Sequence, residues 1–211
     1  MEIIDNIFTI TCDNDTQNLK KYCMFLNGYI KKYIFDKDKD KNGFNKEFPI
    51  TGYLHYKYNI FTFPNPFIYQ LFLDIQSMFL KITKNNNDTN TKYYIKGWLN
   101  YYKSNEFIDW HYHSPVEHNA WHGFFCVDCG ESYTEYTAEN SIINDEKNFD
   151  NKNSTIIHSK NNLLAIGKAN RYHRSSKRKD NNIRITIAFD IVPAHILCND
   201  LTQLQKNWIP L

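Results

Sequence analysis

Long apolar runs are absent from this sequence, and their absence excludes one class of protein. No stretch approaches the roughly 20 apolar residues that a membrane-spanning helix requires. A surplus of one charge is also missing, because 25 Lys and Arg residues balance 23 Asp and Glu residues, for a net charge of +2. We therefore expect no membrane partner and no nucleic acid held by charge. The basic run at 174–179 is interpreted as a solvated turn.

The cysteine content excludes a disulfide framework. The five cysteines are an odd number, and the amino-terminal sequence "MEIIDNIFTI" lacks the features of a signal peptide. We therefore expect a reducing, intracellular compartment, the cytoplasm. Glycine is scarce, with 7 residues, whereas Asn, Lys, Ile and Tyr are plentiful. This bias is typical of AT-rich genomes, microbial or viral, so a virus-encoded protein acting in a host cell fits the composition.

One domain is expected from the size and composition of the chain. The 211 residues are 42% hydrophobic and 16% aromatic, which is enough for one sizeable core. Within this single domain, residues 1–91 are predicted to form a support of helices and a strand. Residues 92–192 are predicted to form the β core, and residues 193–211 a carboxyl-terminal tail.

The supporting part contains three predicted elements. Residues 3–11 alternate as in a strand, and residues 14–35 have helical periodicity. A second helix is predicted over 65–82, where Asn65 is a capping residue and Pro66 suits the first helical position.

From Lys92 onward, short runs with strand composition recur between polar turns. Many short strands at this spacing predict a mainly β sandwich or barrel with the helices on its outside. The runs are "KYYIKGWLNYY", "EFIDWHYH", "WHGFFCVDC", "SYTEYTAE", "STIIHS", "NLLAIG", "RYHRSS" and "NIRITIAFDIV".

Two histidines in the stretch "DWHYH" are separated by one residue. In a strand, alternate side chains share a face, so His111 and His113 are predicted to project together. Two adjacent imidazoles are candidate metal ligands, and His173 on a later strand is a candidate third ligand.

A candidate anion site lies on the last predicted strand. Arg184 and Thr186 share one face of this strand, and the opposite face is continuously apolar. Asn100 and Tyr102 share a face of the strand that precedes the histidine pair, and both side chains can donate hydrogen bonds to a carboxylate.

Cys126 and Cys129 form a single C-x-x-C pair. Structural zinc needs four ligands, and on paper His118 and His122 complete a set. The composition of the segment from Trp121 to Val127 predicts a strand, however, so we predict that both cysteines are core residues at the end of this strand.

These motifs, in this order, resemble those of the iron(II)- and 2-oxoglutarate-dependent oxygenases over residues 92–192. Family members carry a His-x-Asp/Glu pair, a distal His and, about ten residues later, an Arg followed by a Ser or Thr two positions on. The segment "NYY" resembles the Asn-x-Tyr of the alkyl-demethylase branch. The segment "HYHSP" is similar to the H-x-H-P of a branch found in marine microbes and viruses. The resemblance implies a double-stranded β-helix, a jelly-roll fold of cupin type.

The resemblance also implies an activity. A dioxygenase of this family uses Fe²⁺, 2-oxoglutarate and O₂ to hydroxylate a substrate, here an unidentified small molecule or protein side chain, with release of succinate and CO₂. His111, His113 and His173 would hold the iron. Arg184 would pair with the distal carboxylate of 2-oxoglutarate, assisted by Thr186, Asn100 and Tyr102.

The departure from the family lies at the second ligand, where His113 replaces the usual carboxylate. Asp109, two residues before His111, is an alternative source of that carboxylate. Two other functions are also open. One is a three-histidine metalloenzyme of cupin type that does not use 2-oxoglutarate, such as a thiol dioxygenase or an isomerase. The other is a non-enzymatic β-sandwich binding module.

Overall fold

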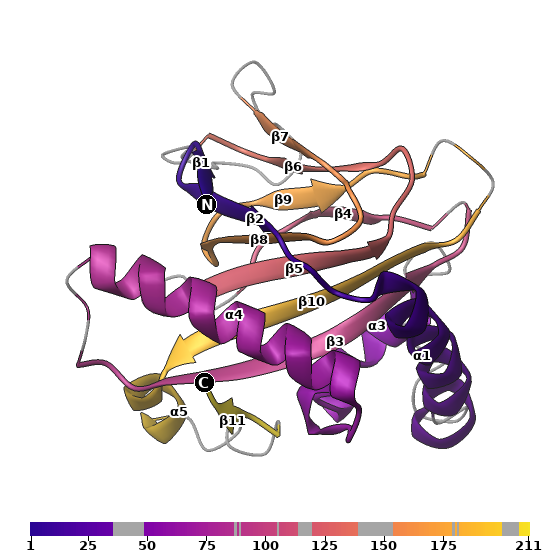
Figure 1. The fold of residues 1–211 in the computed structure, drawn as a ribbon, viewed down its shortest axis with the longest axis horizontal. Coiled ribbons are helices and arrows are strands. Elements are labelled where there is room, and N and C mark those ends of the chain that lie inside the picture. Colours follow the sequence, from indigo (N-terminus) through magenta and orange to yellow (C-terminus); the bar gives the residue numbers. More distant parts are fainter. Residues whose placement is uncertain are drawn as a thin grey trace.

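The computed structural model describes residues 1–35, 49–86, 88, 90–104, 106–113, 120–138, 154–178, 180, 182–199 and 207–211. These residues form two antiparallel sheets flanked by helices (Figure 1). The larger sheet has, in spatial order, β1 (Glu2–Ile4), β2 (Ile7–Thr11), β8 (Leu163–Lys168), β5 (Trp121–Asp128), β10 (Arg184–Pro193), β3 (Tyr93–Tyr102) and β11 (Ile209–Pro210). The smaller sheet has β4 (Ile108–His111), β9 (His173–Ser175), β6 (Tyr133–Tyr136) and β7 (Thr155–His158).

All eight strand runs predicted after Lys92 form strands, from β3 to β10. Successive strands change sheet at nearly every step: β3, β5, β8 and β10 lie in the larger sheet, and β4, β6, β7 and β9 in the smaller one. A chain that winds back and forth between two facing antiparallel sheets in this way is a double-stranded β-helix. The fold implied by the sequence motifs is therefore confirmed.

The single strand predicted over residues 3–11 is wrong. The segment forms the hairpin of β1 and β2, in which Ile4 pairs with Ile7. Asp5 and Asn6 make the turn with φ values of 47° and 59°, a left-handed conformation that Asp and Asn tolerate better than most residues. The hairpin extends the larger sheet, because β2 pairs with β8.

Both predicted long helices are present. The first comprises α1 (Thr16–Tyr29) and the π-helical turn η1 (Ile30–Ile34). The second is α4 (Pro66–Asn85), where the side chain of Asn65 accepts hydrogen bonds from the backbone N–H groups of Phe67 and Ile68. The shorter helices are α3 (Ile50–Tyr53), η3 (Leu54–Lys57), η4 (Ile60–Thr62) and α5 (Ala194–Asn199). None of the helices in the described part of the chain has the length and apolar character needed to cross a membrane.

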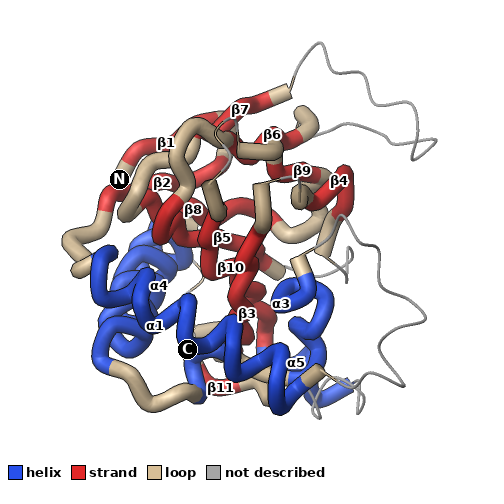
Figure 2. The backbone as a smooth tube through the Cα atoms, turned by 90° about the vertical axis from the view of Figure 1, so that its right-hand side faces the viewer, coloured by secondary structure: helices blue, strands red, loops and turns tan. Residues whose placement is uncertain are grey.

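Helices α1 and α4 cover one face of the larger sheet, and the smaller sheet lies on its other side (Figures 1 and 2). The main core lies between helices and sheet, and each fully buried Leu, Ile or Phe in it contributes roughly 1.5–3 kcal/mol. Its members from α4 include Ile68, Leu71, Ile75, Met78, Phe79 and Ile82; those from β10 are Ile185, Ile187, Ala188, Phe189 and Ile191.

The segment before α4 covers the exposed edge of β3. The hydroxyl group of Tyr58 accepts a hydrogen bond from the N–H of Leu99 at 2.9 Å. The side-chain oxygen of Asn59 accepts one from the N–H of Gly97 at 3.0 Å. These side chains satisfy backbone donors that an open strand edge would leave for another chain. Together with β11, which pairs with Tyr94 and Ile95, these contacts close the edge of β3.

We expect Gly123→Ala to destabilise the protein. A Cβ atom at Gly123 would run into the ring of Phe189 and the backbone carbonyl of Ala165, and overpacking of this kind costs about 1–3 kcal/mol. A Cβ atom at Gly28, in α1, would meet no other atom within 4 Å, so Gly28→Ala should stabilise by about 0.4–1 kcal/mol. Urea unfolding of both variants measures the difference, and equal stability of the two would contradict the packing described above.

Candidate metal centre

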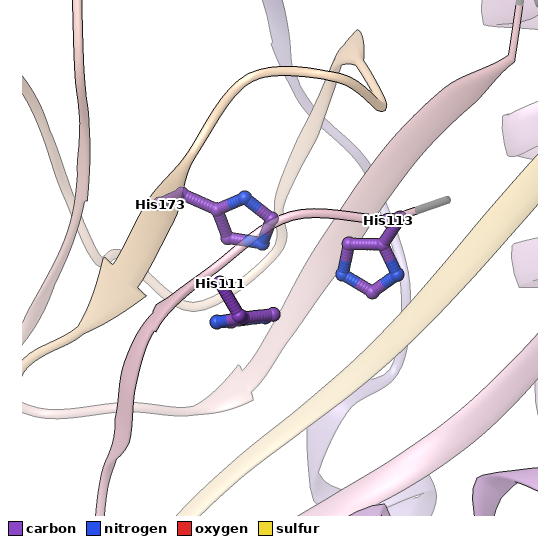
Figure 3. A group of neighbouring side chains, drawn as sticks. All are labelled: His111, His113 and His173. Carbon is purple, nitrogen blue, oxygen red and sulfur yellow. The ribbon is translucent and has the colours of Figure 1, made fainter. Parts of the chain in front are cut away.

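Three histidines converge at the ends of two paired strands of the smaller sheet. His111 ends β4 and faces His173, the first residue of β9, in the strand register. Their ring centroids are 4.3 Å apart, and the ring of His113 lies 5.3 Å from each. One nitrogen atom from each ring falls within 4.8 Å of the other two. Figure 3 shows the three imidazoles around a common space. The fold thus brings together three histidines that are up to 62 residues apart in the chain (173 − 111).

Hydrogen bonds fix the tautomers of His111 and His173. The Nδ1 atom of His111 lies 2.7 Å from the carbonyl oxygen of Asp109, and that of His173 lies 3.0 Å from the carbonyl oxygen of Arg171. A carbonyl oxygen only accepts, so both Nδ1 atoms carry the proton. The Nε2 atom of each ring therefore keeps its lone pair for a metal ion.

His113 presents the same nitrogen but has a different partner. Its Nδ1 atom lies 3.1 and 3.2 Å from the two carboxylate oxygens of Asp190, on β10. Its Nε2 atom is buried without any hydrogen-bond partner among the described residues. A buried imidazole nitrogen with a free lone pair is the feature expected of a metal ligand.

Asp190 and His122 belong to the site, although no sequence motif assigned them to it. His122, on β5, is opposite Asp190 in the sheet register, and its Nδ1 atom lies 2.8 Å from the Asp190 carboxylate. The rings of His113 and His122 are stacked, with centroids 3.8 Å apart. His113, His122 and Asp190 form a second group of possible ligands. The alternation of β10 held the signal for Asp190, because this residue follows Arg184, Thr186 and Ala188 on the same face.

The buried histidines are neutral, as metal ligands must be. Burial and the neighbouring imidazoles lower the pKa of His111 to about 3 and that of His122 to about 4. The same two causes place the pKa of His173 well below its ordinary value. Burial works against the charge of Asp190, but His113 and His122 outweigh it and hold the pKa of this carboxyl group well below its usual range. Asp190 is therefore an ionised carboxylate.

Asp109 does not join the histidines. Its side chain is exposed, and its carboxylate accepts a hydrogen bond from the backbone N–H of Trp110 at 2.8 Å. The reason is an irregularity in β4: Ile108 and His111 are three positions apart in the chain, whereas their partners on β9, Ser175 and His173, are two positions apart. The extra residue breaks the alternation on which the alternative ligand depended.

The four residues of the candidate anion site gather at one end of the same space. Arg184 is opposite Tyr102 in the register, and Thr186 is opposite Asn100. The guanidinium carbon of Arg184 lies 4.9 Å from the centre of the Tyr102 ring. Arg184 is 2% exposed, yet its Nε and Nη1 atoms have no hydrogen-bond partner among the described residues, nor has the side-chain oxygen of Asn100.

The histidines and the anion site line one cavity of about 370 Å³. Along β10, every second residue from Arg184 to Val192 lies on its wall. Beyond Asp190 along β10 the wall is mostly apolar and is formed by a cluster of Ala120, Ala169, Val192, Leu197 and Trp208.

Cys126 and Cys129 are fully buried, as expected of core residues. Neither cysteine belongs to a group of possible metal ligands within the described ranges. His118, the fourth member of the hypothetical zinc set, lies outside those ranges. A hydrogen bond with Cys129, together with burial, raises the pKa of Cys126 well above its ordinary value, so this thiol stays protonated.

Solved structures with the same fold include HygX, a non-heme monooxygenase and a prolyl-4-hydroxylase. HygX from Streptomyces hygroscopicus with nickel, 2-oxoglutarate and hygromycin B bound has a TM-score of 0.59 and 10% identity, over 90% of this chain and 83% of its own. The non-heme monooxygenase ThoJ, in its apo form, has a TM-score of 0.56 and 7% identity, over 90% of this chain and 75% of its own. A Pseudomonas putida prolyl-4-hydroxylase has a TM-score of 0.54 and 6% identity, over 90% of this chain and 87% of its own.

These likenesses establish the fold: the chain has the double-stranded β-helix of the 2-oxoglutarate- and iron(II)-dependent oxygenases. No known family model matches the sequence. No curated protein sequence matches it either.

We expect His111→Ala and His173→Ala each to abolish stoichiometric binding of Fe²⁺, because two imidazoles hold a divalent ion far less tightly than three. Iron analysis after anaerobic loading and desalting measures the loss. His158→Ala is the control, because His158 is an exposed residue of β7. Retention of one equivalent of iron by either cavity variant would place the metal elsewhere.

Asp109→Ala should leave the iron content unchanged. The carboxylate of Asp109 points to the backbone of its own strand, and the lost side chain is not needed for the contact of its carbonyl group with His111. The same iron analysis applies. A loss of iron in this variant would restore Asp109 as a ligand.

Proposed function

We propose that the protein is an Fe²⁺- and 2-oxoglutarate-dependent dioxygenase that hydroxylates an unidentified substrate, with release of succinate and CO₂. The observation that carries the proposal is a single cavity with two features on its wall. One is a group of three imidazoles whose Nδ1 atoms contact oxygen atoms, and the other is a buried arginine with unpaired donors.

The donor set fits ferrous iron. Imidazole nitrogen suits Fe, Zn, Cu and Ni, and His111, His113 and His173 would hold the ion while leaving room for a cosubstrate. His111 and His173 are oriented by backbone carbonyls. His113 is oriented by Asp190. Ligands whose rings are held in this way bind without a large cost in side-chain entropy.

The anion site lies at a suitable distance for a five-carbon dicarboxylate. Ser175 is two residues along β9 from His173, which corresponds to about 7 Å. Its hydroxyl group lies 3.5 Å from that of Tyr102, and Tyr102 packs on Arg184. A molecule whose keto-acid end reaches the metal can therefore place its distal carboxylate on the guanidinium group.

Charge supports the same assignment. A guanidinium group buried without a counter-ion is unfavourable, and a carboxylate repays that cost through paired, charged hydrogen bonds. Thr186 and Tyr102 contribute hydroxyl groups, and the amide of Asn100 lies opposite Thr186. A dianion also balances the charge of a metal that is held by three neutral rings.

The chain's own part in the reaction is to position the reactants and to exclude water. Bound iron with 2-oxoglutarate and O₂ supplies the oxidising chemistry that decarboxylates the cosubstrate and hydroxylates a C–H bond. The apolar end of the cavity, with Val192, Leu197 and Trp208, is the place for the substrate. The HygX structure holds nickel, 2-oxoglutarate and hygromycin B, so the fold accommodates a metal, a keto acid and a small molecule together.

A second candidate function is a three-histidine metalloenzyme of cupin type that uses no 2-oxoglutarate. The ligand count favours it, because a carboxylate ligand is missing. Arg184 disfavours it, because the Nε and Nη1 atoms of the buried guanidinium group would then keep unpaired donors.

We expect Arg184→Ala to bind Fe²⁺ normally but to require far more 2-oxoglutarate. Loss of one partner of a buried charged pair costs roughly 2–5 kcal/mol, a factor of tens to thousands in cosubstrate affinity. The measurement is an anaerobic titration of the Fe²⁺ protein with 2-oxoglutarate, followed by its metal-to-ligand charge-transfer band.

Arg178→Ala is the matched control for net charge, because Arg178 pairs with Asp128 and Asp180 and does not line the cavity. An unchanged titration in Arg184→Ala would contradict the assignment of Arg184 and favour the cupin-type enzyme. Absence of the band in the iron-loaded wild-type protein would contradict the use of 2-oxoglutarate.

A further inference from the structure

We infer that Asp190 is a positioning residue of the metal centre: it supplies, through the imidazole of His113, the carboxylate that the three-histidine group lacks. The inference rests on the proposed function only in that the three histidines hold a metal ion. It concerns a residue that is not one of the three ligands and that the sequence motifs do not include.

The geometry sets Asp190 apart from other carboxylates. It lies on β10 between β5 and β3, opposite His122 on one side and Lys96 on the other. Its side chain contacts the Nδ1 atoms of both His113 and His122, at distances of 2.8–3.2 Å. Carboxylate oxygens accept hydrogen bonds, and both Nδ1 atoms lie within hydrogen-bond distance of this one group, so both imidazoles donate to it. Asp190 therefore holds two rings in the Nδ1–H tautomer at once.

His113 consequently differs from the other two ligands. The Nδ1 groups of His111 and His173 donate to neutral carbonyl oxygens, whereas that of His113 donates to a full negative charge. A carboxylate partner on the far nitrogen fixes the ring orientation and raises the basicity of the nitrogen that faces the metal. His113 is thus the strongest donor of the three.

The charge count gives the same result. The usual triad of two histidines and one carboxylate lowers the charge of Fe²⁺ by one. Three neutral imidazoles leave it at +2, but Asp190 places the missing negative charge one ring further out. With Asp190 included, the net charge around the metal equals that of the usual triad.

His122 keeps this carboxylate in place. It donates to Asp190 at 2.8 Å and packs in parallel against His113, with an interplanar angle of 13°. One carboxylate oxygen of Asp190 accepts a hydrogen bond from His122, and both oxygens lie within hydrogen-bond distance of His113. These contacts keep the carboxylate of Asp190 away from the space between the three histidines. The arrangement explains why an aspartate so close to three ligands does not itself replace His113.

Titration of the full-length apoprotein with Ni²⁺ under calorimetry tests the inference. Asp190→Asn keeps the size of the side chain but removes the charge and one of the two acceptors. We expect it to weaken Ni²⁺ binding about 10- to 100-fold. Asp128→Asn is the matched control, because Asp128 is also a paired, partly buried carboxylate of the larger sheet, bound to Lys20 and Arg178. It should leave the affinity unchanged.

A second measurement does not depend on the folding of any variant at position 190. Long-range ¹H–¹⁵N spectra of histidine-labelled wild-type apoprotein at pH 8 report the tautomer of each neutral ring. His113→Gln assigns the His113 signals by their disappearance. We expect His113 to be the Nδ1–H tautomer, which a merely space-filling Asp190 would not impose.

Equal Ni²⁺ affinity of Asp190→Asn and wild type would overturn the inference alone and leave the three-histidine site intact. An Nε2–H tautomer for His113 would overturn it too. A wild-type protein that binds no Ni²⁺ and no Fe²⁺ would overturn the proposed function and the inference together. Failure to bind 2-oxoglutarate, with metal binding still sensitive to Asp190→Asn, would overturn the proposed function only.

Discussion

Strand β10 separates the apolar core from the polar cavity, and the rest of the structure depends on this strand. One face carries Ile185, Ile187, Phe189 and Ile191 into the core beneath the helices. The other carries Arg184, Thr186 and Asp190 into the cavity. The strand is paired along both edges, by β3 and β5, and its two faces are covered by the helices and by the smaller sheet, so neither face turns to solvent. The apolar face contributes the free energy that holds buried charges on the opposite face in place.

The charged groups of the cavity have fixed positions along β10. Two charged groups of opposite sign lie on the same strand face, six residues apart at Arg184 and Asp190, or about 20 Å along the strand. Asp190 has found its partners within the chain, in His113 and His122. Arg184 keeps unpaired donors. A buried cation without a full complement of acceptors is suited to an anionic ligand, and under the proposed function this ligand also reaches a metal held by the histidines.

The histidines follow one rule. In His111, His113, His122 and His173 the Nδ1 atom contacts an oxygen that can only accept, and burial lowers the pKa of at least three of these rings. In this tautomer the Nε2 atom carries no proton, so its lone pair is available to a metal ion. The donor atoms are thus preorganised by hydrogen bonds within the chain, which is the usual requirement for tight and specific metal binding.

The sequence by itself determined the elements and most of the site. Period-two patterns marked the eight core strands, and the spacing of His111, His113, His173 and Arg184 indicated the fold and the cavity wall, because strand alternation is a local property of the backbone. The strand alternation fails at two places where the backbone is irregular. The turn at Asp5 and Asn6 divides one predicted strand into two, and an extra residue in β4 turns Asp109 away from the histidines. Only the tertiary structure decided that Asp190 meets His113 and His122, 77 and 68 residues away in the chain. Their contact depends on which strands become neighbours in two facing sheets, and side-chain pairing across such distances leaves no periodic signal in one sequence.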